Sequence, residues 1–151
     1  MIKPKKSPIF KVGKELKKRV ENWTGDNMPE IYYENTDDIV VLKVAGSVTF
    51  DQISDALNNY FPLVSKHLIW DYTAGDLDNV SPFDFKRVPE MSKLLFINRQ
   101  LGGKTAFVCP TDYLFGMFRM YTAFADIHAM PYKYEVFKTM REAVFWVRYV
   151  G

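Results

Sequence analysis

Short apolar runs alternate with amphipathic stretches along most of the chain. EIYYE (30–34) and IVVLKVAGSV (39–48) are rich in the β-branched and aromatic residues typical of strands, and the polar NTDD between them predicts a β-hairpin. From residue 49 onward, apolar residues recur every three or four positions in four stretches, which predicts helices. The compact apolar runs between these stretches predict further strands. The predicted helices span 49–66, 81–101, 111–130 and 139–149, and the strands between them span 67–73, 104–110 and 132–138.

This order of elements indicates an α/β fold. A hairpin followed by alternating helices and strands is typical of a mixed, mostly parallel sheet with helices packed on it, here of about five strands. Capping residues mark the helix starts: Thr49 with Gln52 forms a capping-box pattern, and Ser81 precedes a proline at the first helical position. Pro89 lies inside the 81–101 stretch, where it should kink or split the helix.

Composition and charge divide the chain in two. With 151 residues and 48% hydrophobic residues the protein fits one domain with its own core, and the 16% of aromatic residues suggests a contact surface as well. Residues 1–27 hold eight Lys and Arg against three acids, whereas 28–151 hold 12 against 15. We therefore assign 1–27 to a basic tail with a short helix and 28–151 to the domain. The helix could rest on the domain, or form an arm for an anionic surface or nucleic acid.

Several functional classes find little support in the composition. The single Cys109 excludes an internal disulfide, and His67 and His128 are too few and too far apart to suggest a zinc site. No apolar run is long enough to span a membrane, and the basic N-terminus lacks the apolar core of a signal peptide. We expect a cytoplasmic protein without a cofactor, and no nucleic-acid partner for a domain that has no basic face.

The stretch GGKT (102–105) looks like the end of a phosphate-binding loop. The full motif needs a glycine five residues before Gly103, where this chain has Asn98. The order of elements is also reversed, because a helix precedes the stretch and a strand follows it, so no helix N-terminus faces a phosphate. We predict that no nucleotide binds here and that the glycines form the turn that ends the helix.

The C-terminal half carries a family resemblance. GGKTAFVCPTDYLFGMFRMY and YKYEVFKTMREAVFWV resemble SpoIIAA-like proteins, the STAS/SEC14-type group of small bacterial domains, and the likeness extends over about 30–148. The matching features are a strand-ending aspartate, a G-xx-R-M helix, a last strand ending in phenylalanine and an alanine–tryptophan helix. They fall on Asp71, Gly116, Arg119, Met120, Val136, Phe137, Ala143 and Trp146. The resemblance implies a mixed sheet with helices and a mostly non-enzymatic role.

Within that group some members are phosphorylation-switched partners of kinases, others are sensory or transporter appendages, and SEC14-type relatives hold lipids. The phosphorylated members carry an Asp-Ser-Ser-Gly motif where this chain reads DYTAGDLDNVSPFDF. Ser81 occupies a comparable helix N-terminus and is a weak phosphoacceptor candidate, but the motif is absent. The simpler interpretation of Ser81 is a helix cap.

Asp71, Thr73 and Asp76 form the best polar cluster in the sequence. The apolar run of the predicted strand 67–73 ends in Asp71, and AGDLDNV is the predicted loop that follows the strand. Ligands of open α/β sheets gather at the carboxyl ends of strands. The alternative is that Asp71 caps the loop by accepting backbone hydrogen bonds.

The 111–130 helix is apolar nearly all round, so a single sheet-facing stripe cannot bury it. Candidate partner or ligand residues are Tyr113, Phe115, Met117, Phe118 and Tyr121, and Arg119 is expected to pair with a carboxylate or an anionic ligand. Two classes stay open: a homodimeric, regulatory or protein-interaction module, and a small apolar-ligand or lipid-binding module. No catalytic constellation suggests an enzyme. Of Phe115→Glu and Phe118→Glu, the core-facing change should unfold the domain and the other should leave it folded but monomeric, or empty of ligand.

Overall fold

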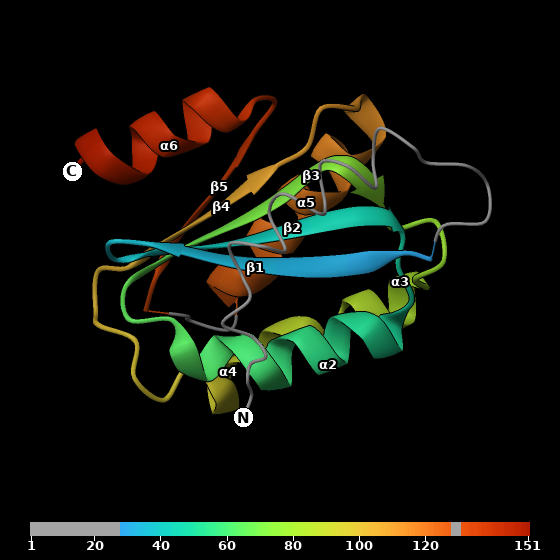
Figure 1. Ribbon diagram of the computed structural model, residues 1–151, viewed down its shortest axis with the longest axis horizontal. Helices are drawn as coiled ribbons and strands as arrows, with labels where there is room; N and C mark the ends of the chain where they lie inside the picture. The colour runs from blue at the N-terminus through green and yellow to red at the C-terminus, as the bar shows by residue number, and fades with distance from the viewer. Residues whose placement is uncertain (1–27, 128–130) are drawn as a thin grey trace.

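The computed structural model describes residues 28–127 and 131–151, with the side chains of 124–127 excepted (Figure 1). Its centre is a five-stranded sheet in which the strands lie in the order of the sequence. The first two strands are antiparallel and the other neighbours are parallel, as predicted. The strands are β1 (Glu30–Thr36), β2 (Ile39–Ser47), β3 (His67–Asp76), β4 (Lys104–Val108) and β5 (Lys133–Phe137). The predicted N-terminal helix within 1–27 lies outside the described residues.

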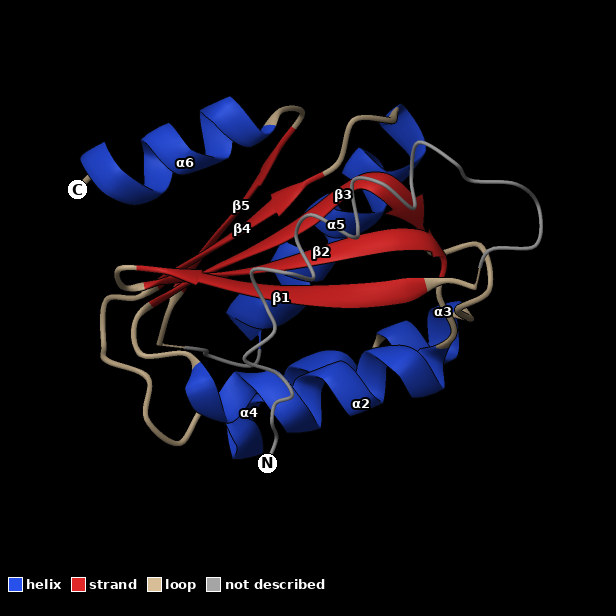
Figure 2. Ribbon diagram, viewed as in Figure 1, coloured by secondary structure: helices blue, strands red, loops and turns tan. Residues whose placement is uncertain are grey.

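Helices cover the sheet unequally (Figure 2). Parallel crossovers are almost always right-handed, so successive crossovers in one direction place their helices on the same face. The larger apolar cluster accordingly joins the sheet to the crossover helices, and the smaller one joins its other face to the last helix. The helices are α2 (Phe50–Tyr60), the 3-10 turn η1 (Phe61–Leu63), α3 (Pro82–Phe85), α4 (Val88–Leu95), α5 (Asp112–Ile127) and α6 (Met140–Tyr149).

Side chains that alternate along each strand supply apolar residues to both faces of the sheet. In β2, Val40 and Leu42 face the crossover helices, whereas Ile39 and Val41 face α6. Since successive side chains of a strand point to opposite sides, a strand covered on both sides is apolar at nearly every position. This explains the continuous run IVVL in the sequence.

The helix caps form as the sequence predicts. Thr49 Oγ1 accepts a hydrogen bond from the Gln52 amide at 3.2 Å, and the Thr49 amide donates to Gln52 Oε1 at 2.9 Å. Ser81 and Thr139 cap α3 and α6 in the same way. The 81–101 stretch is split into α3 and α4, and Pro89 lies in the first turn of α4, where its missing N–H costs no helical hydrogen bond.

One strand differs from the prediction. β3 does not end at Thr73 but continues to Asp76. Asp71 is the last residue paired with β4, while the pairing with β2 continues beyond an irregularity in register. The residues AGD extend past the end of the neighbouring strand β4. They are small or polar, and such a composition is typical of a loop.

The GGKT stretch serves the packing of the last helix. Gly102 has a φ of +82°, which favours glycine, and lies in a turn. The turn does not end a helix as predicted, because α4 stops at Leu95 and a loop separates it from Gly102. Lys104 is buried, and its ammonium donates to the carbonyls of Trp146 at 3.0 Å and Val147 at 3.2 Å, and to that of Val150. The lysine that resembles a phosphate ligand therefore caps the C-terminus of α6, where a cation is favoured.

Candidate functional site

The predicted polar cluster on β3 is held together by local hydrogen bonds. Asp71 Oδ1 accepts from both the amide (2.9 Å) and the hydroxyl (2.5 Å) of Thr73. Asp76 Oδ1 accepts from the amide of Asp78 at 2.9 Å. Both carboxylates thus shape the backbone around them, which is the loop-capping role considered as the alternative for Asp71. Among the described residues no group of three metal-ligating side chains occurs, here or elsewhere.

Ser81 lies at the exposed start of α3. Its hydroxyl accepts from the amide of Asp84 at 3.1 Å, so it is the N-cap of a four-residue helix. An acidic side chain, Asp84, already occupies the first turn of this helix and forms an ion pair with Arg87 at 3.3 Å. The structure therefore gives Ser81 the capping role expected from its position in the sequence.

Helix α5 has one side on the sheet and one in solvent. Leu114, Phe118 and Tyr121 are buried against the core, where the ring of Phe118 stacks on Phe107 at a centroid distance of 4.5 Å. Phe115 and Met117 flank this stripe and are half-buried. The apolar surface predicted for this helix thus divides into a core stripe and an outer side.

The outer side of α5 carries a continuous stripe. Tyr113 is 64% exposed and Met120 is 51% exposed, and seven residues apart they lie on the same side of the helix. Gly116 and Ala123 lie between and beyond them, also exposed. We call Tyr113, Gly116, Met120 and Ala123 the α5 stripe. It combines two large apolar side chains with two residues small enough to let another chain approach the helix backbone.

The two arginines near this region have opposite environments. Arg119, the predicted candidate for anion binding, is exposed. Arg99, which the sequence did not single out, is only 7% exposed. Its Nε donates to the Lys66 carbonyl and its Nη2 to Thr105 Oγ1, both at 2.8 Å. Nothing in the local sequence INRQLGG predicts this burial, because the partners come from distant segments.

His67 lies close to Arg99 at the start of β3. Its Nδ1 accepts from the amide of Lys104 at 3.0 Å, and its Nε2 is 3.9 Å from Asp38 Oδ2. Burial lowers the pKa of His67, the positive charges of Lys66, Lys104 and Arg99 act in the same direction, and Asp38 opposes them. The imidazole is therefore held neutral, as the acceptor of a backbone hydrogen bond.

We expect the stability of the domain to fall as the pH drops below about 6.5, the ordinary pKa of histidine. The folded protein binds a proton at His67 less readily than the unfolded chain, so the contribution of the neutral imidazole is complete above that pH. It is lost as the pH falls through the lower pKa of the folded state. Chemical denaturation at several pH values measures this dependence.

The matched variant is His67→Asn, whose side-chain oxygen can replace Nδ1 as the acceptor without titrating. Its stability should decrease less steeply between pH 7 and pH 5 than that of the unmodified protein. Equal slopes in the two proteins would show that His67 plays no part.

Cys109 is buried at the end of β4, and burial, together with the charge of Asp71, raises its pKa to about 12. A thiol in such surroundings is a poor nucleophile because the thiolate is the reactive form. Its role in the described structure is to fill the core, where it belongs to the larger apolar cluster.

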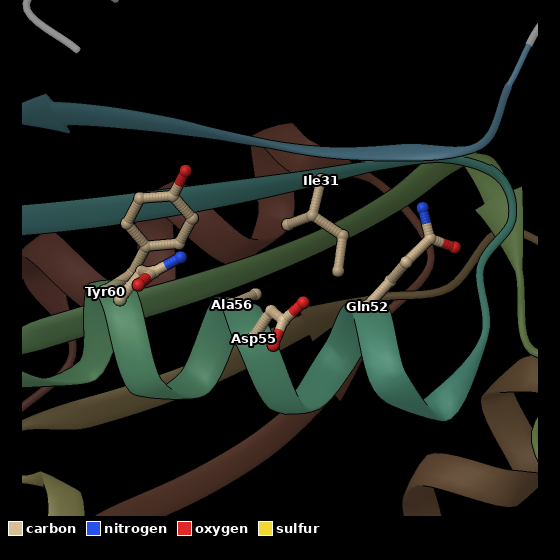
Figure 3. A pocket seen from close by; sticks show the side chains of 6 residues that line it. Ile31, Gln52, Asp55, Ala56 and Tyr60 are labelled. Carbon is tan, nitrogen blue, oxygen red and sulfur yellow. The ribbon is translucent and has the colours of Figure 1, made fainter. Parts of the chain in front are cut away.

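A small hollow opens between β1 and α2 (Figure 3). It is lined by Ile31, Gln52, Asp55, Ala56, Asn59 and Tyr60. Gln52 spans its end by donating to the carbonyl of Pro29 at 2.7 Å, and Tyr60 stacks on Tyr33 at 4.9 Å. The lining is mostly exposed or half-buried and lacks the apolar walls that are typical of a lipid site.

A second set of exposed apolar side chains is not apparent from the sequence pattern. These residues lie around η1, the end of α4 and the loop that leads to β4, where Asn98 donates to the Pro62 carbonyl and ties the loop to η1. They are Leu63, Leu94, Ile97 and Leu101. Single exposed aliphatic residues are common on surfaces, so periodicity alone gives no signal for such a set.

No protein-family model matches the chain, and no curated protein matches it significantly. Among solved structures it is similar to an uncharacterized protein of the DUF3478 family with a SpoIIAA-like fold from Shewanella loihica PV-4. The two share a TM-score of 0.53 and 16% identity over 83% of this chain and 99% of that one. The protein has a SpoIIAA-like fold.

The resemblance stated from the sequence is thus confirmed for the fold. At 16% identity the SpoIIAA-like architecture carries no residue roles from one chain to the other. In the part of the chain that the structure describes, no helix combines the length and apolarity needed to cross a bilayer.

Proposed function

We propose that this SpoIIAA-like domain is a non-enzymatic protein-interaction module of the STAS type that forms a homodimer through the α5 stripe. The proposal depends most on Gly116. This residue lies in the interior of a 16-residue helix, on its exposed side, and a Cβ atom built there would meet nothing within 4 Å. Packing within the chain therefore does not require a glycine at this position.

Glycine in an exposed helix interior costs about 1 kcal/mol relative to alanine. Such a cost is understandable if another helix approaches the backbone closely at this point. Tyr113 and Met120, one on each side of Gly116 along the helix, supply apolar contact area, and methionine adapts readily to a partner surface. A two-fold axis across the stripe would bring two copies of the same surface together.

The alternative class, a module for an apolar ligand, receives less support. Aromatic side chains that could line a cleft instead contact one another: Phe118 lies 5.0 Å from Tyr72, 5.3 Å from Phe85 and 4.5 Å from Phe107, measured between ring centroids. These are packing distances of a filled core. Absence of a nucleotide ligand and a cytoplasmic location remain predictions from the sequence.

The test is the molecular mass in solution over a range of concentrations, measured by light scattering. We expect a dimer for the unmodified protein and a monomer for Met120→Glu, because the exposed position tolerates a charge in the monomer but not in a dimer contact. The matched control is Leu94→Glu, which places the same charge on an exposed apolar residue of α4.

Leu94→Glu should leave the dimer intact, and both variants should keep the melting temperature of a folded domain. A monomeric mass for the unmodified protein at all concentrations would refute the dimer. Dissociation by Leu94→Glu alone would place the contact at η1 and α4 instead of α5.

A further inference from the structure

Arg99 carries a charge that is buried without a carboxylate partner among the described residues. A buried guanidinium without an anion is costly, since desolvation of a charge amounts to several kcal/mol. The two aromatic faces around it compensate in part: the guanidinium carbon lies 4.5 Å from the ring centre of Phe96 and 4.1 Å from that of Tyr132.

Two polar groups near this guanidinium are left without a hydrogen-bond partner. Arg99 Nη1 and the hydroxyl of Tyr134 are both buried and both unpartnered. Arg99 Nη2 donates to Thr105 Oγ1, and Thr105 pairs with Tyr134 in the register of β4 and β5, so the two groups belong to the same region of the sheet. Buried polar groups in native proteins are nearly always hydrogen-bonded, so each exception needs an explanation.

The guanidinium itself supplies the positive charge on this face of the sheet, where its Nη2 is held by Thr105. The ammonium of Lys104 lies on the other face, against α6. The Nη1 group offers two N–H donors and the Tyr134 hydroxyl a third. A set of donors in a positive environment is complementary to an oxygen atom of an anion.

From this geometry we infer that Arg99 and Tyr134 form a binding site for a small oxyanion, a carboxylate or a phosphate. The bound oxygen accepts hydrogen bonds from Arg99 Nη1 and the Tyr134 hydroxyl. Arg99 is anchored for this role, because its other two nitrogens are held by Lys66 and Thr105.

The site is closed in this structure, since Nη1 and the Tyr134 hydroxyl have no access to solvent. Tyr132 is half-buried, and its ring centre lies 4.1 Å from the guanidinium carbon; the ring of Phe96 lies beside it, in edge contact with Tyr132 at 5.4 Å. Access for the anion therefore requires Tyr132 to move. Only the open fraction of the protein can bind the anion, so the apparent affinity equals the intrinsic affinity multiplied by that fraction.

The experiment is calorimetric titration of the full chain with sodium acetate and, separately, sodium phosphate, at pH 7 and an ionic strength held constant with sodium chloride. We expect saturable binding of at least one of the two anions. Tyr134→Phe should weaken it about tenfold, the loss of one hydrogen bond to a charged group. Tyr149→Phe removes the hydroxyl of an exposed tyrosine at the end of α6 and should have no effect.

Arg99→Gln should abolish binding, whereas Arg119→Gln, at an exposed arginine, should leave it unchanged. If Arg99→Gln does not fold, the result for Tyr134→Phe decides whether the site exists. The Tyr134 hydroxyl makes no hydrogen bond within the described structure, so its removal does not weaken the fold. Tyr132→Ala should strengthen binding by opening the site. Acetate binding alone identifies a carboxylate ligand, and phosphate binding alone a phosphate.

The inference is overturned if neither anion binds the unmodified protein or Tyr132→Ala. It is also overturned if the binding that occurs is equally strong in Tyr134→Phe and Tyr149→Phe. Neither result depends on the oligomeric state, so the oxyanion site and the α5 homodimer stand or fall separately.

Discussion

Phe118→Glu is expected to unfold the domain. Phe118 is 2% exposed and its ring contacts those of Tyr72, Phe85 and Phe107. Loss of a buried phenylalanine costs about 3–5 kcal/mol, and burial of a carboxylate without a partner adds several more. Since single domains are stable by about 5–15 kcal/mol, the variant should lose the cooperative thermal transition seen by circular dichroism.

Phe115→Glu is the matched control on the same helix. Phe115 is half-buried at the side of α5, and the ammonium of Lys138 lies 5.2 Å from its ring centre. A carboxylate there can reach solvent and Lys138, so this variant should remain folded with a modestly lower melting temperature. A folded Phe118→Glu, or unfolding by both changes, would contradict the orientation of α5 described above.

Gly103→Ala is expected to destabilise the domain by roughly 3 kcal/mol, the upper end of the usual cost of overpacking. A Cβ atom at this position would lie 2.1 Å from the backbone carbonyl oxygen of Lys66. The contact joins the loop before β4 to the segment before β3, and the same carbonyl accepts the hydrogen bond from Arg99 Nε. Relief of the clash must therefore shift backbone in one of two anchored segments.

Gly102→Ala separates this effect from that of backbone conformation. Nothing lies within 4 Å of a Cβ atom at Gly102, but its φ of +82° is unfavourable for alanine. The cost should be about 1–2 kcal/mol. Urea denaturation measures both variants, and an equal loss in the two would show that the loop relaxes around the new methyl group at 103.

Elements governed by local chemistry could be predicted from the sequence. Thr49, Ser81 and Thr139 cap the helices they precede because the cap and its target amide lie within three residues of each other. The antiparallel hairpin and the parallel pairing of the later strands follow from the alternation of helices and strands, whereas the order of the strands in the sheet does not. The end of β3 could not be predicted in this way, because it depends on where β4 stops pairing.

For the candidate site, too, features set by local sequence could be predicted and features set by distant segments could not. The excess of apolar side chains on α5 is visible in the sequence, and the structure assigns them to two sides of the helix. Arg99 could not be found, since its burial is produced by Lys66, Thr105 and Tyr132, which are up to 33 residues away in the chain. The sequence instead drew attention to Arg119, which lies in an apolar helix but faces solvent.

The strand order has a consequence for how the chain folds. Each strand pairs only with strands adjacent to it in the sequence, so the sheet can grow from β1 to β5 one strand at a time, although each parallel pairing first requires a whole crossover to close, as between Leu68 and Thr105. Helix α6, however, follows all five strands. Ile69, Ala106 and Val108 therefore remain uncovered during synthesis until α6 emerges. A chain whose synthesis stops before α6 exposes an apolar surface that is prone to aggregation.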